Sequence, residues 1–464
     1  MSELKPRITG TEMEWGLLLS DDDRVFKEPT NELAEILQKD FPADIQRVKG
    51  PTGFVLGNGS RLYIDIGPHF EYATPEDTSF WGTVANEIAG EHIMTRMLTK
   101  SVARRGGSYR LHKRVVDDSG TTWGYHENYF MPEAKCLPSE AALTPMALHL
   151  ASRQVFTGAG WQTKYGNFNI SQKIHSLSNS FDRGTTGGNK PLVNLRDESH
   201  TDENKPGKRL HITSGDPNMS PLITYMKLAT TSIVLRLTEL GIQPDIRFRS
   251  HDAVLAAKRF TADPNLRSTY ELEDRLHAPR KLTALDIQDY LVTLAEQTFS
   301  PERGLPPLPD EEVAALRKWR QMVDALKHDP SSQIGIIEWI TKQALFGQAV
   351  AKGKMTPNNL GNMDRQWDLI DKRGLALRYR EKRWAPWMKD VLIKERVHTA
   401  PSTTRARPRG RFVKLGAAMS PVVSMANWDY VSDGRRIPLN DPYDSSCSTV
   451  EALFARPQST KRSA

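Results

Sequence analysis

The chain has 464 residues, 38% of them hydrophobic and 26% charged, which is typical of a globular protein large enough for more than one domain. The net charge of +7 leaves two interpretations, an ordinary basic protein or one that prefers acidic partners, and the absence of an aromatic ladder or nucleic-acid motif argues against DNA or RNA. The apolar runs are too short for a membrane helix, and the N-terminus has no signal-peptide core. The two cysteines, Cys136 and Cys447, are far apart in sequence, so neither a disulfide framework nor a zinc cluster is expected. These features predict a cytoplasmic protein.

The first predicted strand lies within residues 7–20 and carries two carboxylates on one face. Glu12 and Glu14 are two residues apart, so their side chains point the same way in a strand. This pair is typical either of a solvated strand edge or of a site for a hard divalent cation such as Mg²⁺, which uses oxygen ligands. A turn at 20–23 and a helix over Asn31–Lys39 are expected next.

A strand with an unusually polar face follows the turn-like segment 57–60. The residues Arg61, Tyr63 and Asp65 alternate with apolar Leu62 and Ile64. A cation, a phenol and a carboxylate on one strand face favour a site that holds phosphates and a metal ion.

The segment 74–79 predicts the start of a long helix, with Pro75 in its first turn and an end near Arg105 at a Gly-Gly pair. Strands are expected over 109–116 and 122–131. In the second of these His126 and Asn128 share a face, opposite to Tyr125, Glu127 and Tyr129. Such a pair suits a nucleotide or a metal ion, although a histidine with satisfied hydrogen bonds in a core is the commoner outcome.

The rest of the chain alternates polar strands with helices. A helix is predicted over 143–156, a strand over 168–175, and a strand from Lys208 that places Arg209, His211 and Thr213 on one face. Helices are then expected over 222–240, 283–298, 310–327 and 332–346. A basic linker over 398–410, a short strand-bearing segment up to about Phe454 and a frayed tail complete the prediction, which divides the chain into a large domain (1–397) and a small C-terminal domain (398–464).

Several blocks, in this order, resemble the Pup ligase and depupylase (PafA/Dop) family. The blocks are Gly10-Thr-Glu-Met-Glu-Trp-Gly16, Asn58-Gly-Ser-Arg-Leu-Tyr-Ile-Asp-Ile-Gly-Pro-His-Phe-Glu-Tyr-Ala-Thr74, Tyr125-His-Glu-Asn-Tyr-Phe-Met131, Ile170-Ser-Gln-Lys173, Val193-Asn-Leu-Arg-Asp-Glu-Ser-His200, Arg209-Leu-His-Ile-Thr-Ser-Gly-Asp-Pro-Asn-Met219, Ala284-Leu-Asp-Ile-Gln288 and Asn427-Trp428. Together they are much more specific than any single block. The resemblance implies an α+β fold, in which a glutamine-synthetase-like large domain has a curved antiparallel sheet backed by helices and a small C-terminal domain follows.

The resemblance also implies roles for individual residues. Asp65 matches the catalytic carboxylate. Glu12, Tyr63 and Glu71 match Mg²⁺ ligands, and Glu14 joins that set. The positions that match or line the nucleotide site are Arg61, Thr74, Trp428, Arg196, Arg209, His211, His126 and Asn128.

The implied activity is an ATP- and Mg²⁺-dependent ligation. The side-chain carboxylate of the C-terminal glutamate of Pup, a small disordered acidic protein, would become a glutamyl phosphate, and a lysine of a target protein would attack it. A lysine with a pKa of about 10.4 needs a base at neutral pH, and Asp65 is expected to serve. A basic surface suits an acidic protein substrate. No nucleic-acid or membrane partner is expected.

Four functions remain open within this resemblance. The segment between Gly16 and Arg61 is too short for the extra loop of depupylases, which favours the ligase, whereas Pro75-Glu76 and parts of other blocks favour a depupylase or Pup deamidase. Phe70, Lys173 and Ser199 replace a proline, an arginine and a proline of the family pattern. These departures also allow a divergent ATP-dependent enzyme with a non-Pup substrate, or a non-catalytic binder of acidic peptides.

Overall fold

The computed structural model describes residues 3–21, 24–25, 45–47, 53–65, 69–184, 189–249, 252–384, 388, 390–418 and 425–454. Across these ranges, none of the helices combines the length and the apolar character that crossing a membrane requires. The helix expected over 31–39 and the expected tail lie outside the described residues.

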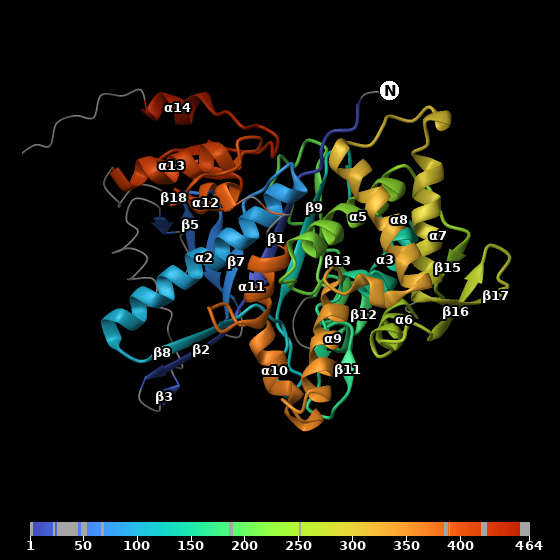
Figure 1. The fold of residues 1–464 in the computed structure, drawn as a ribbon. Coiled ribbons are helices and arrows are strands. Elements are labelled where there is room, and N and C mark those ends of the chain that lie inside the picture. Colours follow the sequence, from blue (N-terminus) through green and yellow to red (C-terminus); the bar gives the residue numbers. More distant parts are fainter. Residues whose placement is uncertain are drawn as a thin grey trace, which may run out of the picture.

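A nine-stranded sheet forms the centre of the molecule (Figure 1). Neighbouring strands in it are antiparallel, except for the parallel pair of its first two members. In spatial order the strands are β12 (Asn179–Asp182), β13 (Pro191–Asn194), β14 (Lys208–Ile212), β9 (Tyr125–Met131), β1 (Thr9–Glu14), β7 (Phe70–Ala73), β6 (Arg61–Ile64), β5 (Gly53–Leu56) and β4 (Ile45–Arg47). The predicted α+β class with a large, mainly antiparallel sheet is thereby confirmed.

The smaller sheets flank this centre. They are β2 (Gly16–Asp21) with β3 (Arg24–Val25) and β8 (Ser108–His112), β10 (Trp161–Gln162) with β11 (Phe168–Asn169), β15 (Ile246–Arg247) with β16 (Thr269–Asp274) and β17 (Pro279–Thr283), and β18 (Met425–Ala426) with β19 (Tyr430–Ser432) and β20 (Arg436–Pro438).

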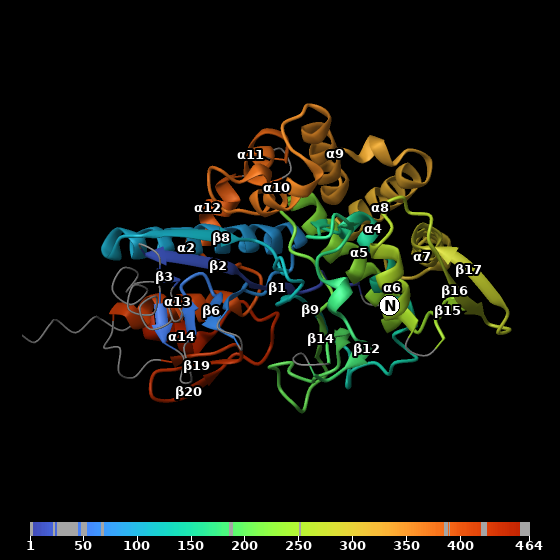
Figure 2. The ribbon, with the colours of Figure 1, turned by 90° about the horizontal axis from the view of Figure 1, so that it is seen from below.

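Helices cover one face of the large sheet (Figure 2). Thr9 and Thr11 of β1 bond to Thr83 and Glu87 of α2, so the odd-numbered side chains of β1 point toward this helix layer. Over the described residues, and including α13 and α14 of the C-terminal part described below, the helices are α2 (Phe80–Arg105), α3 (Thr144–Ser152), α4 (Gln154–Thr157), α5 (Pro221–Glu239), α6 (Asp252–Thr261), α7 (Ala284–Thr298), α8 (Asp310–His328), α9 (Glu338–Ala351), α10 (Leu360–Trp367), α11 (Leu375–Tyr379), α12 (Asp390–His398), α13 (Ala406–Ala418) and α14 (Ser448–Phe454).

The apolar side chains between this sheet and the helices form the main core. The helix α5 is buried along almost its whole length, as its apolar sequence predicts. Met226, Ala229 and Ile233 of this helix are nearly or fully buried in that cluster. Odd-numbered side chains of β1 and β9 contact α2 and α5, so the even-numbered side chains of these strands lie on the opposite face.

The C-terminal elements lie against that opposite face, at the β5 end of the sheet. Val55, which pairs with Arg61 and therefore points to the same side, packs with Phe412 and Val413 of α13. Gly410 of α13 lies so close to the turn before β6 that a Cβ on it would be 2.5 Å from the Gly57 oxygen. The polar strand β6 is thus anchored from its start by the C-terminal segment.

Four predicted elements differ from the structure. The long helix begins at Phe80, because Ser79 caps it by accepting a hydrogen bond from the Gly82 N–H, and Pro75 lies ahead of it. The strand expected over 168–175 is only β11 followed by a short 3-10 turn over Ile174–Ser176. The helix expected from Ser332 begins at Glu338.

The fourth difference is the expected basic linker at 398–410. Its second half belongs to α13, and Arg409 is fully buried. The stretch is therefore packed structure. The domain boundary at residue 397 stays a prediction.

Candidate active site

Three carboxylates meet on the open face of the sheet, where β1, β6 and β7 lie side by side. Glu14 is directly opposite Glu71 in the β1–β7 register, and Asp65 follows β6. One oxygen from each of the three lies within 4.8 Å of the others. The Tyr63 hydroxyl donates a hydrogen bond to Glu71, its register partner. This group, called the acidic cluster below, consists of Glu14, Asp65 and Glu71.

The electrostatics of the acidic cluster call for a cation. Burial raises the pKa of Glu71 well above its usual value, and the charges of Glu12 and Glu14 raise it further. Burial also raises the pKa of Glu14, with a contribution from Asp65. A hard divalent cation offsets both burial and repulsion, and its preferred ligands are oxygen atoms of this kind. The residues present therefore fit Mg²⁺.

Replacing Glu71 with Gln tests this reasoning through stability. A glutamate titrates near 4.5 when unfolded and at a higher pH in the fold, so stability is lost as the pH rises from about 4.5 through the folded pKa. Glu71→Gln removes this loss and keeps an acceptor for Tyr63. Without metal, the variant should melt at a higher temperature than the wild type at pH 8, and the gap should shrink at pH 4.

Magnesium should reverse the comparison at pH 8, because the wild type gains more from the ion than the variant does. Thermal melts with and without MgCl₂ measure both effects. The control is Glu395→Gln, because Glu395 is exposed and its carboxylate lies 3.5 Å from a single arginine. The melting temperature of this variant should respond to pH and to Mg²⁺ as that of the wild type does. Equal responses to Mg²⁺ in Glu71→Gln and wild type would contradict a metal role for Glu71.

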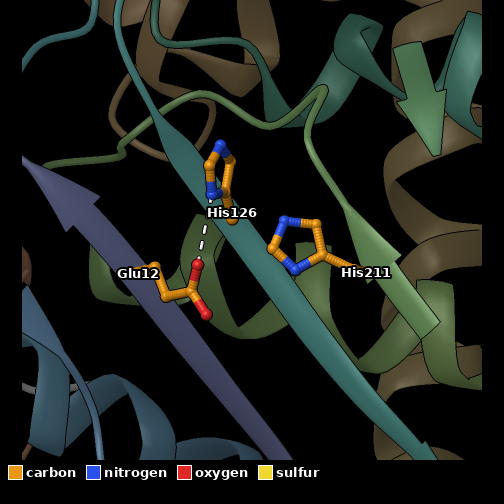
Figure 3. Close-up of side chains that lie close together, drawn as sticks. All are labelled: Glu12, His126 and His211. Carbon is orange, nitrogen blue, oxygen red and sulfur yellow. Dashed lines mark hydrogen bonds and ion pairs between the residues drawn. The ribbon is translucent and has the colours of Figure 1, made fainter. Parts of the chain in front are cut away.

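A second group of possible metal ligands lies beside the acidic cluster (Figure 3). Glu12 of β1, His126 of β9 and His211 of β14 come from three adjacent strands, and Figure 3 draws their side chains gathered over β9. His126 Nδ1 lies 3.2 Å from a Glu12 oxygen, and the two imidazole rings are 4.8 Å apart. Burial acts to raise the pKa of Glu12, but the His126 hydrogen bond and the surrounding positive charges, of which Arg209 is one, outweigh it and hold this pKa well below its usual value.

Asn128 connects this second group into one network. Its Nδ2 donates to Glu12 at 3.1 Å, and its Oδ1 accepts from Arg209 at 3.0 Å and lies 3.1 Å from His211 Nδ1. With Nδ1 of His211 bonded to that oxygen, its Nε2 remains buried without a partner among the described residues. Burial lowers the pKa of His211 well below its usual value, so the ring is neutral and its free nitrogen is available to a metal ion or another donor.

Two adjoining cavities cover these groups and share Glu12, His200, Arg209 and Trp428 in their walls. The first, about 580 Å³, is mainly apolar and is lined by Thr74 and Trp428. The second, about 730 Å³ and partly open, is polar. The predicted site residues that line the second cavity are Glu12, Tyr63, Asp65, Glu71, His126, Arg196, Arg209, His211 and Trp428. An apolar cavity that adjoins a polar one suits a molecule with one apolar and one charged end.

Two predicted nucleotide residues lie at the edge of this arrangement. Arg61 lines neither cavity, and its guanidinium lies over the Tyr63 ring, 5.1 Å from the centroid. Its Nε is buried without a partner among the described residues, so it retains a free donor. Arg196 is on the rim of the second cavity, with a side chain 49% exposed and 3.5 Å from Glu198.

The three departures from the family pattern have distinct surroundings. Phe70 is buried in the core between β7 and α2 and does not reach the cavities. Lys173 is buried beside Glu14 and donates to the Trp123 carbonyl, and burial lowers its pKa to about 8. The Ser199 hydroxyl accepts from the Arg209 N–H at 3.2 Å and donates to Asp197 at 2.8 Å, so it takes part in holding β14.

Further residues at the cavities were absent from the sequence-based site. His200 lines both cavities, with a left-handed backbone conformation (φ 51°). Glu76 and Arg405 line the first cavity. Glu76 follows the matched block directly and belongs to the Pro75-Glu76 pair that favours a depupylase, but neither signal predicts a place in the cavity wall. Nothing local distinguishes Arg405 from the other arginines of its basic stretch.

Comparison with known proteins identifies the family to which the chain belongs. The family model described as Pup-ligase protein matches residues 7–432. The Pup--protein ligase of Acidimicrobium ferrooxidans is 32% identical over 457 residues, covering 95% of this chain and 94% of that protein. The Pup--protein ligase of Mycobacterium ulcerans is 30% identical over 482 residues, covering 99% of each.

Two solved structures have the same architecture. The complex between the prokaryotic ubiquitin-like protein Pup and its ligase PafA matches with a TM-score of 0.83 and 26% identity, over 98% of this chain and 93% of that one. PafA in complex with ADP matches with a TM-score of 0.76 and 25% identity, over 94% and 95%. These likenesses confirm the expected glutamine-synthetase-like fold class. On the family match and the shared sequence over nearly the whole length, the chain belongs to the Pup-ligase family.

Proposed function

We propose that this protein is an ATP- and Mg²⁺-dependent ligase. It joins the side-chain carboxylate of the C-terminal glutamate of a Pup-like protein to a lysine of a target protein, through a glutamyl phosphate. The observation that carries the proposal is the acidic cluster, with Asp65 in it, beside two connected cavities that suit a nucleotide. Relatives named Pup--protein ligase and a likeness to PafA bound to Pup support the substrate.

The first cavity suits the nucleoside, and the second suits the phosphates. Thr74 is buried, and its hydroxyl accepts a hydrogen bond from the Thr11 N–H, which holds it at the wall that Trp428 also lines. Arg209 reaches the second cavity and neutralises phosphate charge. Glu12, Glu14, Tyr63 and Glu71 would hold Mg²⁺, which supplies charge neutralisation of the transferring phosphoryl group.

Asp65 takes a proton from the attacking lysine amine. It lines the polar cavity within the acidic cluster and is only half-buried, so an incoming lysine can reach it. Residues on one sheet face therefore bind the nucleotide, orient the amine and accept its proton.

Incubation of the protein with ATP, MgCl₂, a lysine-bearing protein and Pup ending in Glu tests the proposal. A conjugate heavier than the target by Pup minus one water is expected by mass spectrometry. A second reaction with Pup ending in Gln and a third with a preformed conjugate test the alternatives. Released ammonia or freed Pup, without new conjugate, would replace the ligase with a depupylase or deamidase. Consumed ATP with unaltered Pup would favour a different substrate.

A further inference from the structure

Arg409 of α13 connects three separate parts of the wall around the nucleotide cavity. Its Nε and Nη2 donate to the Gly59 carbonyl at 3.1 and 2.7 Å, at the turn before β6. Its Nη1 donates to the Trp428 carbonyl at 3.1 Å and to a Glu76 oxygen at 3.2 Å. The guanidinium carbon lies 4.7 Å from the centre of the Trp428 ring. One side chain thus holds the turn, Glu76 and Trp428 together.

Arg405 makes a second set of contacts with Glu76, on the side that faces the cavity. Its Nε donates to Glu76 at 2.9 Å, and its Nη1 donates to the carbonyls of Leu439 and His200. Burial acts to raise the pKa of Glu76, but the two arginines outweigh it and lower this pKa to about 2. Glu76 is therefore ionised at working pH, and both arginines are paired with it.

Arg409 lies behind the cavity wall, so it can position other residues but does not itself contact a molecule in the cavity. Glu76, Arg405 and Trp428 line the first cavity, whereas Arg409 lines neither cavity and is fully buried. A buried ion pair is an inefficient source of stability, because removing two charges from water offsets much of their attraction. The contacts of Glu76, Arg405 and Arg409 instead fix the position of Trp428.

We propose that Arg409 is a positioning residue for nucleotide binding. It supports one face of the Trp428 ring and its carbonyl, so that the ring is fixed as a wall for the nucleotide base. This inference rests on the proposed nucleotide role of the cavity. Lysine in place of Arg409 keeps the charge but cannot donate in one plane to Gly59, Glu76 and Trp428 while stacking on the ring.

A double-mutant cycle on ADP affinity tests the proposal. Isothermal titration with ADP and MgCl₂ is measured for wild type, Arg409→Lys, Trp428→Ala and the double variant. Arg409→Lys should weaken ADP binding about tenfold, the scale of a lost stacking contact. When Trp428 is already alanine, Arg409→Lys should weaken ADP binding by less than a further factor of about two, because Arg409 acts through the Trp428 ring. At saturating ATP, kcat should stay near wild type while KM rises.

The control is Arg236→Lys, a comparably buried arginine that pairs with Glu312 at 2.5 Å between α5 and α8 and lines neither cavity. It should lower the melting temperature and leave ADP affinity unchanged. Wild-type ADP affinity in Arg409→Lys, or losses that add in the double variant, would overturn the positioning role. Absence of ADP binding by the wild type would instead contradict the proposed function.

If Arg409→Lys does not fold, amide hydrogen exchange of the wild-type protein with and without ADP provides a second test that needs no variant. Adding ADP should slow amide exchange at residues 427–430 and at the turn 57–60, because both are tied to Arg409. Unchanged exchange in both segments at saturating ADP would contradict the proposal.

Discussion

Asp65→Asn is expected to reduce conjugate formation by about 10²–10⁴-fold, the usual contribution of a general base. Asparagine has the same shape but cannot accept the lysine proton. The other members of the acidic cluster and the residues at Trp428 are unchanged, so ADP affinity should stay within about threefold of wild type.

The pH dependence sharpens this prediction. Without the base, only lysine that is already deprotonated can attack, so the residual rate of Asp65→Asn should rise about tenfold per pH unit toward the lysine pKa of about 10.4. The wild-type rate should rise less steeply. Gel densitometry of conjugates between pH 7 and pH 9 measures both slopes, and an unchanged rate at pH 7 would rule out Asp65 as the base.

Glu12→Ala is expected to weaken ADP binding in MgCl₂ by more than about tenfold, as loss of a metal-site group does. Glu12 belongs to the histidine-containing group and accepts bonds from Asn128 and His126. Its loss removes a ligand and one of the two carboxylates near Arg209, which lies 3.5 Å from Glu12 and 3.3 Å from Glu198. Without Mg²⁺ the variant should bind ADP at least as well as the wild type, because a negative charge beside the phosphates is gone.

Calorimetry with and without MgCl₂ separates these two effects. The exposed Glu395→Ala variant is the matched control, since Glu395 belongs to neither group of possible metal ligands and lines neither cavity, so its loss should alter neither affinity. Wild-type affinity of Glu12→Ala in MgCl₂ would count against a metal role for Glu12.

Much of the site follows from the alternation of side chains in strands. Period-two patterns alone predict that Tyr63 and Asp65 share a face, and that Arg209 and His211 do so. What the patterns lack is register. Glu14 opposite Glu71, and Glu12 opposite His126, depend on pairings between strands far apart in the chain, which local residue preferences do not encode.

The missed features have tertiary causes. Glu76 is typical of a first helical turn, but two arginines more than 300 positions later hold it outside the helix. Arg409 is typical of an exposed linker by composition, since arginine is rarely buried without a partner, and its partners are invisible locally. Phe70 is one of the departures that allow a non-Pup substrate, yet its side chain fills the core and lines neither cavity.

The central claim is that the acidic cluster and the neighbouring cavities serve to activate a carboxylate with ATP. It is tested most directly by repeating the incubation with Pup whose C-terminal glutamate carries ¹⁸O in its side-chain carboxylate. Phosphorylation of that carboxylate predicts one ¹⁸O in the released inorganic phosphate, in proportion to conjugate formed. Phosphate without ¹⁸O, despite conjugate formation, would contradict the account.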